Sequence, residues 1–301
     1  MKVYTTPDKQ AAKAVSKASA IGESRHDNKG GDDFKIRSLS TAETYKEVLT
    51  QVATWLREQG IQRGLQSISV TEAKQYLAER SEDLGQSSLD KHRNAIQCVI
   101  VQKLERVTTE KVAVLANQSR AYSADQARAI LNSQNDRNAI STAIAFASGL
   151  RAHELLTIRP VSEQPASSHR TWSADRFTGR DGVRYSVIGK GGLTREIQLP
   201  QGLADRLEAR KLDAPVQVTD RKIHYTQHYD VAGGKNWSDN FTSHSKAQLE
   251  FTNGGHGLRH GYAQTRMSEL QERGASYRQS LTIVSQELGH FRASITETYL
   301  R

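Results

Sequence analysis

Helical periodicity dominates the chain from residue 41 onward. Apolar side chains recur there at three- and four-residue intervals, which places them on one face of an amphipathic helix. These positions are Tyr45, Val48, Leu49, Val52, Trp55 and Leu56. Ser40 and Glu43 have the spacing of a capping box at the start of this helix, and Ser69 opens a second helix in the same way. A third stretch at 88–104 completes a helical domain predicted over residues 41–106.

Residues 1–40 show no such pattern. They are polar, rich in Lys, Ser, Asp and Gly, and the segment GESRHDNKGGDD offers no periodic apolar face to bury. A composition of this kind cannot supply the burial that offsets the entropy of folding. We therefore expect a flexible polar arm over residues 1–40.

A second domain is predicted over residues 122–301, after a linker at 107–121. A capping box at Ser123 and Gln126 starts its first helix, helical patterning continues to Gly149, and a further turn or two ends before Pro160. The period then changes from 3.6 towards 2, because Tyr185 and Val187, and later Ile197 and Leu199, alternate with polar residues on either side of GKGG. This pattern predicts a β-hairpin with Lys190 at its tip.

Helical patterning returns near the C-terminus. It runs through 258–270 and 281–288, where Gly289 is placed to end the second of these helices. Ser294 and Glu297 have capping-box spacing and predict a last helical turn that carries Tyr299. The stretch 213–250 has no readable period. The predicted fold is mainly α with a small β-hairpin sheet, a helical domain followed by a mixed α/β domain.

Composition narrows the range of partners. Lys plus Arg number 42 against 33 Asp plus Glu, a formal net charge of +9, which favours an anionic partner such as nucleic acid over solubility alone. Cys98 is the only cysteine, so an intramolecular disulfide is excluded, and we expect a buried, inert thiol in a reducing compartment. No apolar run approaches the roughly 20 residues that span a bilayer, and a signal peptide is not evident. A cytoplasmic location is expected.

Some residues suit phosphate chemistry. Moving a phosphodiester without a metal requires a nucleophile, donors for the non-bridging oxygens and an acid for the leaving oxygen. Arg151 in SGLRAHELL and Arg259 in HGLRH each offer a planar fork of donors that matches phosphate oxygens. Taken singly, each is better explained as a solvated surface arginine.

The order of the segments is more specific. SGLRAHELL, VIGKGGLTREIQLP, GGHGLRHGYA and ELGHFRASITETYL follow one another as the signature segments do in the tyrosine recombinase, or phage-integrase, family. The second domain resembles that family over residues 120–301, whereas the first resembles it only in size and helical character. The resemblance assigns the family's functional positions to Arg151, Glu154, Lys190, His256, Arg259, His290 and Tyr299.

The resemblance implies a role for each position. Tyr299 is expected to attack a DNA phosphate and to become linked to the 3′ end of the broken strand. A phenol is a weak nucleophile at neutral pH, and His256 is the expected base. Lys190 is expected to protonate the leaving 5′ oxygen, a task that suits an ammonium with a lowered pKa.

The remaining positions are expected to hold the phosphate. Arg151 and Arg259 would bind it, His290 would donate to a non-bridging oxygen, and Glu154 would orient Arg151. The simpler interpretations make Tyr299 part of a fraying terminus, His290 a cation at a helix end and Lys190 a hairpin charge kept for solubility. The agreement in order and spacing favours the functional interpretation.

The function implied is site-specific DNA recombination. Two domains would clamp double-stranded DNA, and a homo-tetramer assembled on two DNA sites would exchange strands in the cytoplasm, in association with the nucleoid. Neither a nucleotide nor a metal cofactor is required, because the covalent link stores the bond. The alternatives are a topoisomerase-like enzyme that relaxes DNA and a non-catalytic DNA-binding regulator. Many members of the family continue past the nucleophile into a segment that docks on a neighbouring protomer, but this sequence ends at Arg301.

Two other motifs do not support a site. GKGG at 189–192 lacks the Ser or Thr that a phosphate-binding loop needs after its lysine. His224 and His228 are four residues apart, but no glutamate or third ligand accompanies them, so no metal site is predicted there. His153 and His260 are interpreted as packing or DNA-backbone residues.

Overall fold

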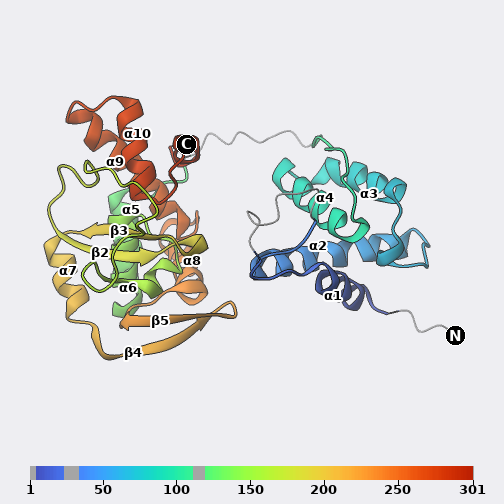
Figure 1. Cartoon of the computed structure of the whole chain (residues 1–301), viewed down its shortest axis with the longest axis horizontal. Helices are drawn as coiled ribbons and strands as arrows, with labels where there is room; N and C mark the ends of the chain where they lie inside the picture. The colour runs from blue at the N-terminus through green and yellow to red at the C-terminus, as the bar shows by residue number, and fades with distance from the viewer. Residues whose placement is uncertain (1–4, 24–33, 111–118, 301) are drawn as a thin grey trace. The chain divides into compact units, whose positions relative to one another are not determined.

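The computed structural model describes residues 5–23, 34–110 and 119–300. The chain divides into two compact units, residues 1–116 and 117–301, and each is described by itself (Figure 1). In the described residues no helix is both long and apolar enough to cross a membrane.

The first unit is helical. Its elements are α1 (Pro7–Ala18), α2 (Leu39–Glu58), η1 (Leu65–Ser67), α3 (Val70–Asp83) and α4 (Gln86–Ile100). The amphipathic faces predicted from the sequence meet in one core, which includes Leu49, Leu56, Tyr76, Leu77 and Ile96. The capping box at Ser69 and Glu72 is present as predicted, with both reciprocal hydrogen bonds.

Helix α1 corrects the expectation of a flexible arm over residues 1–40. Thr6 accepts a hydrogen bond from the Lys9 amide and caps the helix at its start, and Ala11, Ala14 and Ala18 are buried. Helix α1 packs against α2, and the small alanine side chains let the two backbones approach closely. The buried face of α1 consists of alanines. Alanine is only weakly hydrophobic, so the pattern does not stand out from the polar residues around it. Residues 24–33, the glycine-rich part of the predicted arm, lie outside the described residues.

The start of α2 differs from the prediction by two residues. Ser38, rather than Ser40, occupies the N-cap and accepts from the Thr41 amide at 3.2 Å. Both serines offer the same hydroxyl, so spacing alone could not separate them. Of the linker predicted at 107–121, residues 111–118 lie outside the described residues.

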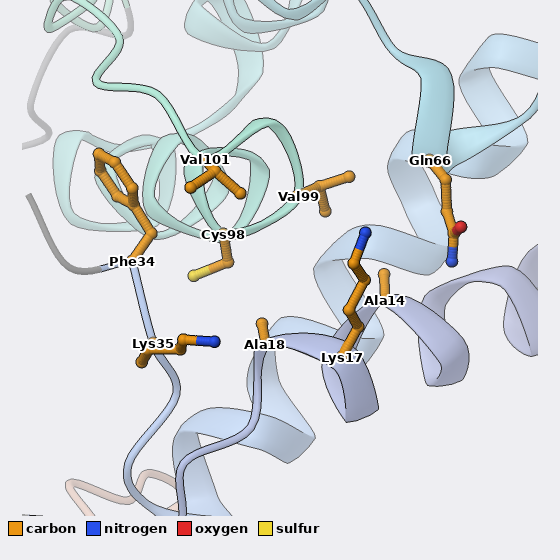
Figure 2. A pocket seen from close by; sticks show the side chains of 9 residues that line it. All are labelled: Ala14, Lys17, Ala18, Phe34, Lys35, Gln66, Cys98, Val99 and Val101. Atoms are coloured by element: carbon orange, nitrogen blue, oxygen red, sulfur yellow. The ribbon is translucent and has the colours of Figure 1, made fainter.

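Cys98 is half-buried rather than fully buried, which corrects the expected environment of its thiol. It lines a pocket with Val99 and Val101 at the end of α4 and with Ala18 of α1 (Figure 2). The thiol donates to the Asn94 carbonyl, 3.3 Å away. Helix α4 ends at this pocket because Val101 adopts a left-handed backbone conformation.

The second unit combines helices with two small antiparallel sheets. One sheet has the order β1-β2-β3 and the other pairs β4 with β5. Helix α6 lies at the centre of the unit, where it packs against α5, α8, α9 and β3. The elements are α5 (Ala124–Ser133), α6 (Asp136–Ser148), η2 (Glu154–Thr157), β1 (Arg159–Pro160), β2 (Val183–Ile188), η3 (Lys190–Gly192), β3 (Thr194–Leu199), α7 (Gln201–Glu208), β4 (Lys211–Asp220), β5 (Ile223–Tyr229), α8 (Gly234–Leu249), α9 (His256–Glu272), α10 (Tyr277–Glu287) and α11 (Ala293–Glu297).

The mainly helical class with small β elements is confirmed. The predicted hairpin is β2–β3, and Lys190 opens the short turn between the strands. The uninterpreted stretch 213–250 contains most of a second hairpin, β4–β5, and all of α8. No residue of β4 is buried, so this strand lacks the alternation of buried and exposed positions by which strands are recognised.

Candidate active site

A buried carboxylate lies between two arginines at the start of η2, in the segment that follows α6. Glu154 accepts from the Arg151 guanidinium at 2.9 Å and from that of Arg195 at 2.9 Å, and the Arg151 amide donates to it at 2.8 Å. Burial alone would raise the pKa of Glu154, but the charges of Arg195 and the neighbouring arginines outweigh it and lower the pKa to about 2. The carboxylate is therefore ionised at neutral pH, and it fixes the direction of Arg151.

Arg259, in the first turn of α9, is held by main-chain oxygens. Its Nη1 donates to the Gly149 carbonyl and its Nη2 to the Leu288 carbonyl, each at 2.5 Å. Both acceptors lie at helix C-termini, where the helix dipole favours a cation. Burial, followed by the charge of Arg151, lowers the pKa of Arg259 to about 9. The guanidinium thus stays charged at neutral pH although it is fully buried.

A helix-ending motif places His290. Gly289 has φ +74° and donates to the Gln286 carbonyl at 2.9 Å, while the His290 amide donates to the Ser285 carbonyl at 2.8 Å. These two bonds define a Schellman motif, with glycine at the left-handed position as predicted. The motif turns the chain so that His290 Nε2 lies 2.9 Å from Arg259 Nη2.

The contact with Arg259 fixes the tautomer of His290. A guanidinium only donates, so His290 Nε2 accepts and the proton of the neutral ring resides on Nδ1. Burial, followed by the charge of Arg259, lowers the pKa of His290 to about 3. At neutral pH the ring is therefore uncharged, and Nδ1–H is its available donor.

Tyr299 lies at the centre of the cluster. Its ring centroid is 4.9 Å from that of His260, 5.3 Å from that of His290 and 5.4 Å from that of His256. The Cζ of Arg259 lies over the same ring, 5.4 Å from its centroid. Only 6% of Tyr299 is exposed, so this tyrosine is packed into the domain and is not part of a fraying terminus.

Backbone contacts hold Tyr299 in place. Its amide donates to the Thr296 carbonyl at 2.9 Å, and Gln264 donates to its carbonyl at 3.2 Å. The predicted capping box at Ser294 and Glu297 does not form, because α11 begins at Ala293 without a side-chain cap. The short helix is held instead by packing against α10.

The ring of His256 lies beside that of Tyr299. Burial, followed by the charge of Arg259, lowers the pKa of His256 to about 4. A ring that is uncharged at neutral pH is able to accept a proton. The His256 ring also lies 5.7 Å from that of His260, centroid to centroid.

Lys190 is the sequence-predicted residue that the structure leaves apart. It is exposed at the hairpin turn, and across the described residues no hydrogen bond or ion pair joins it to the cluster. The residue before this turn nevertheless lies close to the site, since a Cβ added to Gly189 would lie 3.3 Å from Glu154 Oε1. The structure thus gathers Arg151, Glu154, His256, Arg259, His290 and Tyr299 and places Lys190 on an adjacent turn.

The structure adds two residues to the set predicted for the site. Arg195 is 1% exposed and also donates to the Glu287 carbonyl at 2.8 Å. The alternation of β3 offered a signal, because Arg195 has the same parity as the inward-facing Ile197 and Leu199. His260, interpreted as a packing or DNA-backbone residue, lies against Tyr299, and its Nδ1 is buried without a hydrogen-bond partner among the described residues.

The chain has the fold of the tyrosine recombinases, a helical domain followed by a mixed α/β domain. No protein-family model and no curated protein sequence matches the chain. The XerH site-specific recombinase, solved with palindromic difH substrate in a post-cleavage complex, is 14% identical with a TM-score of 0.55 and matches over 100% of this chain and 94% of its own.

Two further structures share this fold. A lambda integrase dimer bound to a COC′ core site is 14% identical with a TM-score of 0.55, over 99% of this chain and 77% of its own. The Tn1549 transposon integrase in complex with circular intermediate DNA is 13% identical with a TM-score of 0.51, over 99% of this chain and 95% of its own. At these identities the likeness concerns the fold.

Proposed function

We propose that this chain is a site-specific DNA recombinase that breaks and rejoins duplex DNA through a covalent bond between Tyr299 and a 3′ phosphate. The observation that carries the proposal is the packing of the Tyr299 ring against His256, His290 and Arg259. These four residues come from two parts of the chain, the first turn of α9 and the segment that follows α10. The shared fold of three DNA-bound recombinases and integrases supports the same function.

The first step exchanges one phosphoester for another. The Tyr299 oxygen forms a bond to phosphorus, and the bond from phosphorus to the 5′ oxygen breaks. His256, neutral at physiological pH, takes the phenolic proton, and Lys190 on the hairpin turn supplies a proton to the leaving 5′ oxygen. Attack by a 5′ hydroxyl on the phosphotyrosine reverses these transfers and reseals the strand.

The cations of the site stabilise the charge that develops on the phosphate. Arg151 is oriented by the buried Glu154 and is about a quarter exposed at its side chain, which leaves it accessible to a ligand. Both terminal nitrogens of Arg259 are occupied, but its Nε is buried and lacks a partner among the described residues. Together with Nδ1–H of His290, these groups provide donors for the non-bridging oxygens.

The partner proposed is double-stranded DNA. The net charge of +9 supplies sequence-independent attraction to phosphate and makes the affinity strongly dependent on salt. We propose a homo-tetramer on two DNA sites as the strand-exchanging assembly. In this scheme the first unit is the core-binding domain and the second carries the chemistry.

Capture of the covalent intermediate tests the proposal. The protein is expressed in cells, and the cells are lysed in denaturant. The DNA that remains covalently attached to the protein is recovered and sequenced. We expect wild-type protein to retain fragments that share a short sequence at their 3′ attached ends. Tyr299→Phe keeps the ring but removes the nucleophilic oxygen, so it should retain none. Tyr277→Phe, at an exposed tyrosine of α10, is the matched control and should behave as wild type.

The outcomes separate three kinds of protein. Attached fragments with a common sequence, together with recombination between two copies of that sequence, support the recombinase. Attached fragments without sequence preference, together with relaxation of supercoiled DNA, indicate a topoisomerase-like enzyme. Salt-sensitive DNA binding with no covalent product from wild-type protein would indicate a non-catalytic regulator.

A further inference from the structure

The turn between β4 and β5 carries two basic residues in a costly conformation. Arg221 has φ +48° and Lys222 has φ +63°, and they connect strands that pair up to Asp220 and Ile223. A two-residue hairpin loop with both residues at positive φ is a type I′ turn, for which Asn-Gly is the favoured sequence. Residues with a Cβ disfavour positive φ. The turn nevertheless contains arginine and lysine where asparagine and glycine would be more stable.

This hairpin is an exposed arm. It is drawn in Figure 1 as a two-stranded ribbon at the edge of the second unit. No residue of β4 is buried, and the first residues of β5 are exposed together with Arg221 and Lys222. The two basic residues at the turn are therefore accessible from solvent.

The arm is nevertheless fixed close to the phosphate site. Strand β5 packs against η2, and the ring of Tyr225 lies 6.4 Å from that of His153, centroid to centroid. His153 follows Arg151 by two residues in the sequence. Strand β5 of the arm thus lies beside the segment that contains Arg151.

A second connection ties the turn itself to the same segment. Asp220, the last residue of β4, accepts from the Lys235 amide at 2.7 Å and so caps the start of α8. The preceding amide, that of Gly234, donates to the Ala152 carbonyl at 2.7 Å. Through these bonds the turn is held at a set position relative to the loop after Arg151, although its side chains face solvent.

We propose that Arg221 and Lys222 form a clamp on the DNA backbone and contact phosphates that neighbour the phosphate held at Arg151. This inference rests on the proposed function, and it adds an interaction surface that the chemistry of the site does not require. The ligand fits by charge, because two exposed cations on a fixed, narrow arm match the regular spacing of a phosphate backbone. Such contacts position the duplex without selecting its sequence.

A turn replacement separates binding from folding. In the double variant Arg221→Asn with Lys222→Gly, the turn receives its favoured sequence, so thermal stability should be unchanged or higher while both charges are lost. Binding is measured with a fluorescent DNA duplex of random sequence over a range of salt concentrations. We expect roughly tenfold weaker binding at moderate salt and a fall of about 2 in the slope of log K against log salt.

Two further double variants serve as controls for the change of turn sequence and for a general loss of positive charge. Arg221→Gln with Lys222→Gln removes the charges without changing the turn residues to Asn-Gly, and it must show the same loss of slope. Arg206→Gln with Arg278→Gln removes two exposed charges from α7 and α10 and should lower the slope by less. A loss confined to the Asn-Gly variant, or an equal loss in the α7 and α10 control, overturns the proposal.

Failure of the two proposals can be told apart. If wild-type protein binds the duplex and the turn variants match it in affinity and slope, the clamp is wrong and the recombinase proposal is untouched. If wild-type protein shows no salt-dependent binding at all, the DNA function itself is wrong, and the clamp falls with it.

Discussion

The aromatic ring of Tyr299 lies over the guanidinium of Arg259, with Cζ 5.4 Å from the ring centroid. Arg259 is fully buried in this arrangement, and its terminal nitrogens donate to main-chain oxygens. The cation–π contact and the packing reinforce each other. Under the proposed function, the nucleophilic oxygen and a guanidinium that would bind the phosphate therefore lie on neighbouring side chains.

Glu154→Gln should be strongly destabilising. The substitution removes the charge that two arginines share, and breaking a buried ion pair costs about 3–5 kcal/mol. Urea unfolding measures the loss. Glu163→Gln disrupts a half-exposed pair with Lys211 and should cost about 1 kcal/mol at most. Equal losses in the two variants would contradict the role assigned to Glu154.

The same carboxylate predicts a dependence of stability on pH. The pKa of Glu154 is lowered from 4.5 to about 2, so the unfolded chain takes up its proton first. The stabilisation from this group is complete above pH 4.5 and is lost as the pH falls towards 2. Wild-type protein should therefore lose more stability over that window than Glu154→Gln does.

His256 should titrate far below an ordinary histidine. Burial and the charge of Arg259 lower its pKa from 6.5 to about 4, so the unfolded chain binds this proton at a higher pH than the folded chain. The stability that depends on the neutral ring is complete above pH 6.5 and declines as the pH falls towards 4. NMR of the imidazole protons, assigned with His256→Gln, measures the midpoint. A midpoint near 6.5 would remove His256 as a base held neutral by its site.

Gly289→Ala should impair cleavage more than folding. The residue has φ +74°, and an added Cβ would lie 2.8 Å from Arg195 Cδ, so we expect the turn that carries His290 and the side chain of Arg195 to move apart. We expect about 1–2 kcal/mol of destabilisation and roughly 100-fold slower single-turnover cleavage.

Gly274→Ala is the matched control for this substitution. Gly274 has φ +90°, and an added Cβ would meet nothing within 4 Å. It carries a similar backbone cost but leaves the site undisturbed. Cleavage slowed equally by both substitutions would show that general strain, rather than the position of His290, is responsible.

Helix α1 should contribute to the stability of the first unit. Ala11 is fully buried, and Asp at this position would bury an unpaired carboxylate, which costs about 2 kcal/mol or more. Ser16→Asp, at an exposed position of the same helix, should have little effect. Thermal unfolding of the full chain compares them, and a flexible arm would tolerate both equally.

Much of this architecture could be predicted because its signals are local. The α2 face is recognised by large apolar residues, the β2–β3 hairpin by alternation around GKGG, and the end of α10 by Gly289. Helix α1 was missed because alanines form its buried stripe, and β4 because its exposure removes the period. The residues of the site were recognised as an ordered set, by resemblance.

Their convergence depends on the packing of segments far apart in the chain, which local patterns do not encode. Arg195 illustrates the limit. Its position in the alternation of β3 indicates that the side chain points inward. Only the fold shows that it donates there to Glu154 and to a carbonyl at the end of α10. His260 is a similar case, since its contact with Tyr299 joins α9 to the end of the chain.

The anchoring of Arg259 by the Gly149 and Leu288 carbonyls has a consequence for how the sequence is free to vary. Every amino acid presents the same main-chain oxygen, so a different side chain at 288 leaves this acceptor in place. A change in the length of either helix has a larger effect. One residue inserted into α6 or α10 rotates the end of that helix by about 100°, which turns its carbonyl oxygen away from Arg259. Substitutions at Gly149 or Leu288 would thus act through backbone strain and core packing, whereas an insertion or deletion in either helix would displace the acceptor itself.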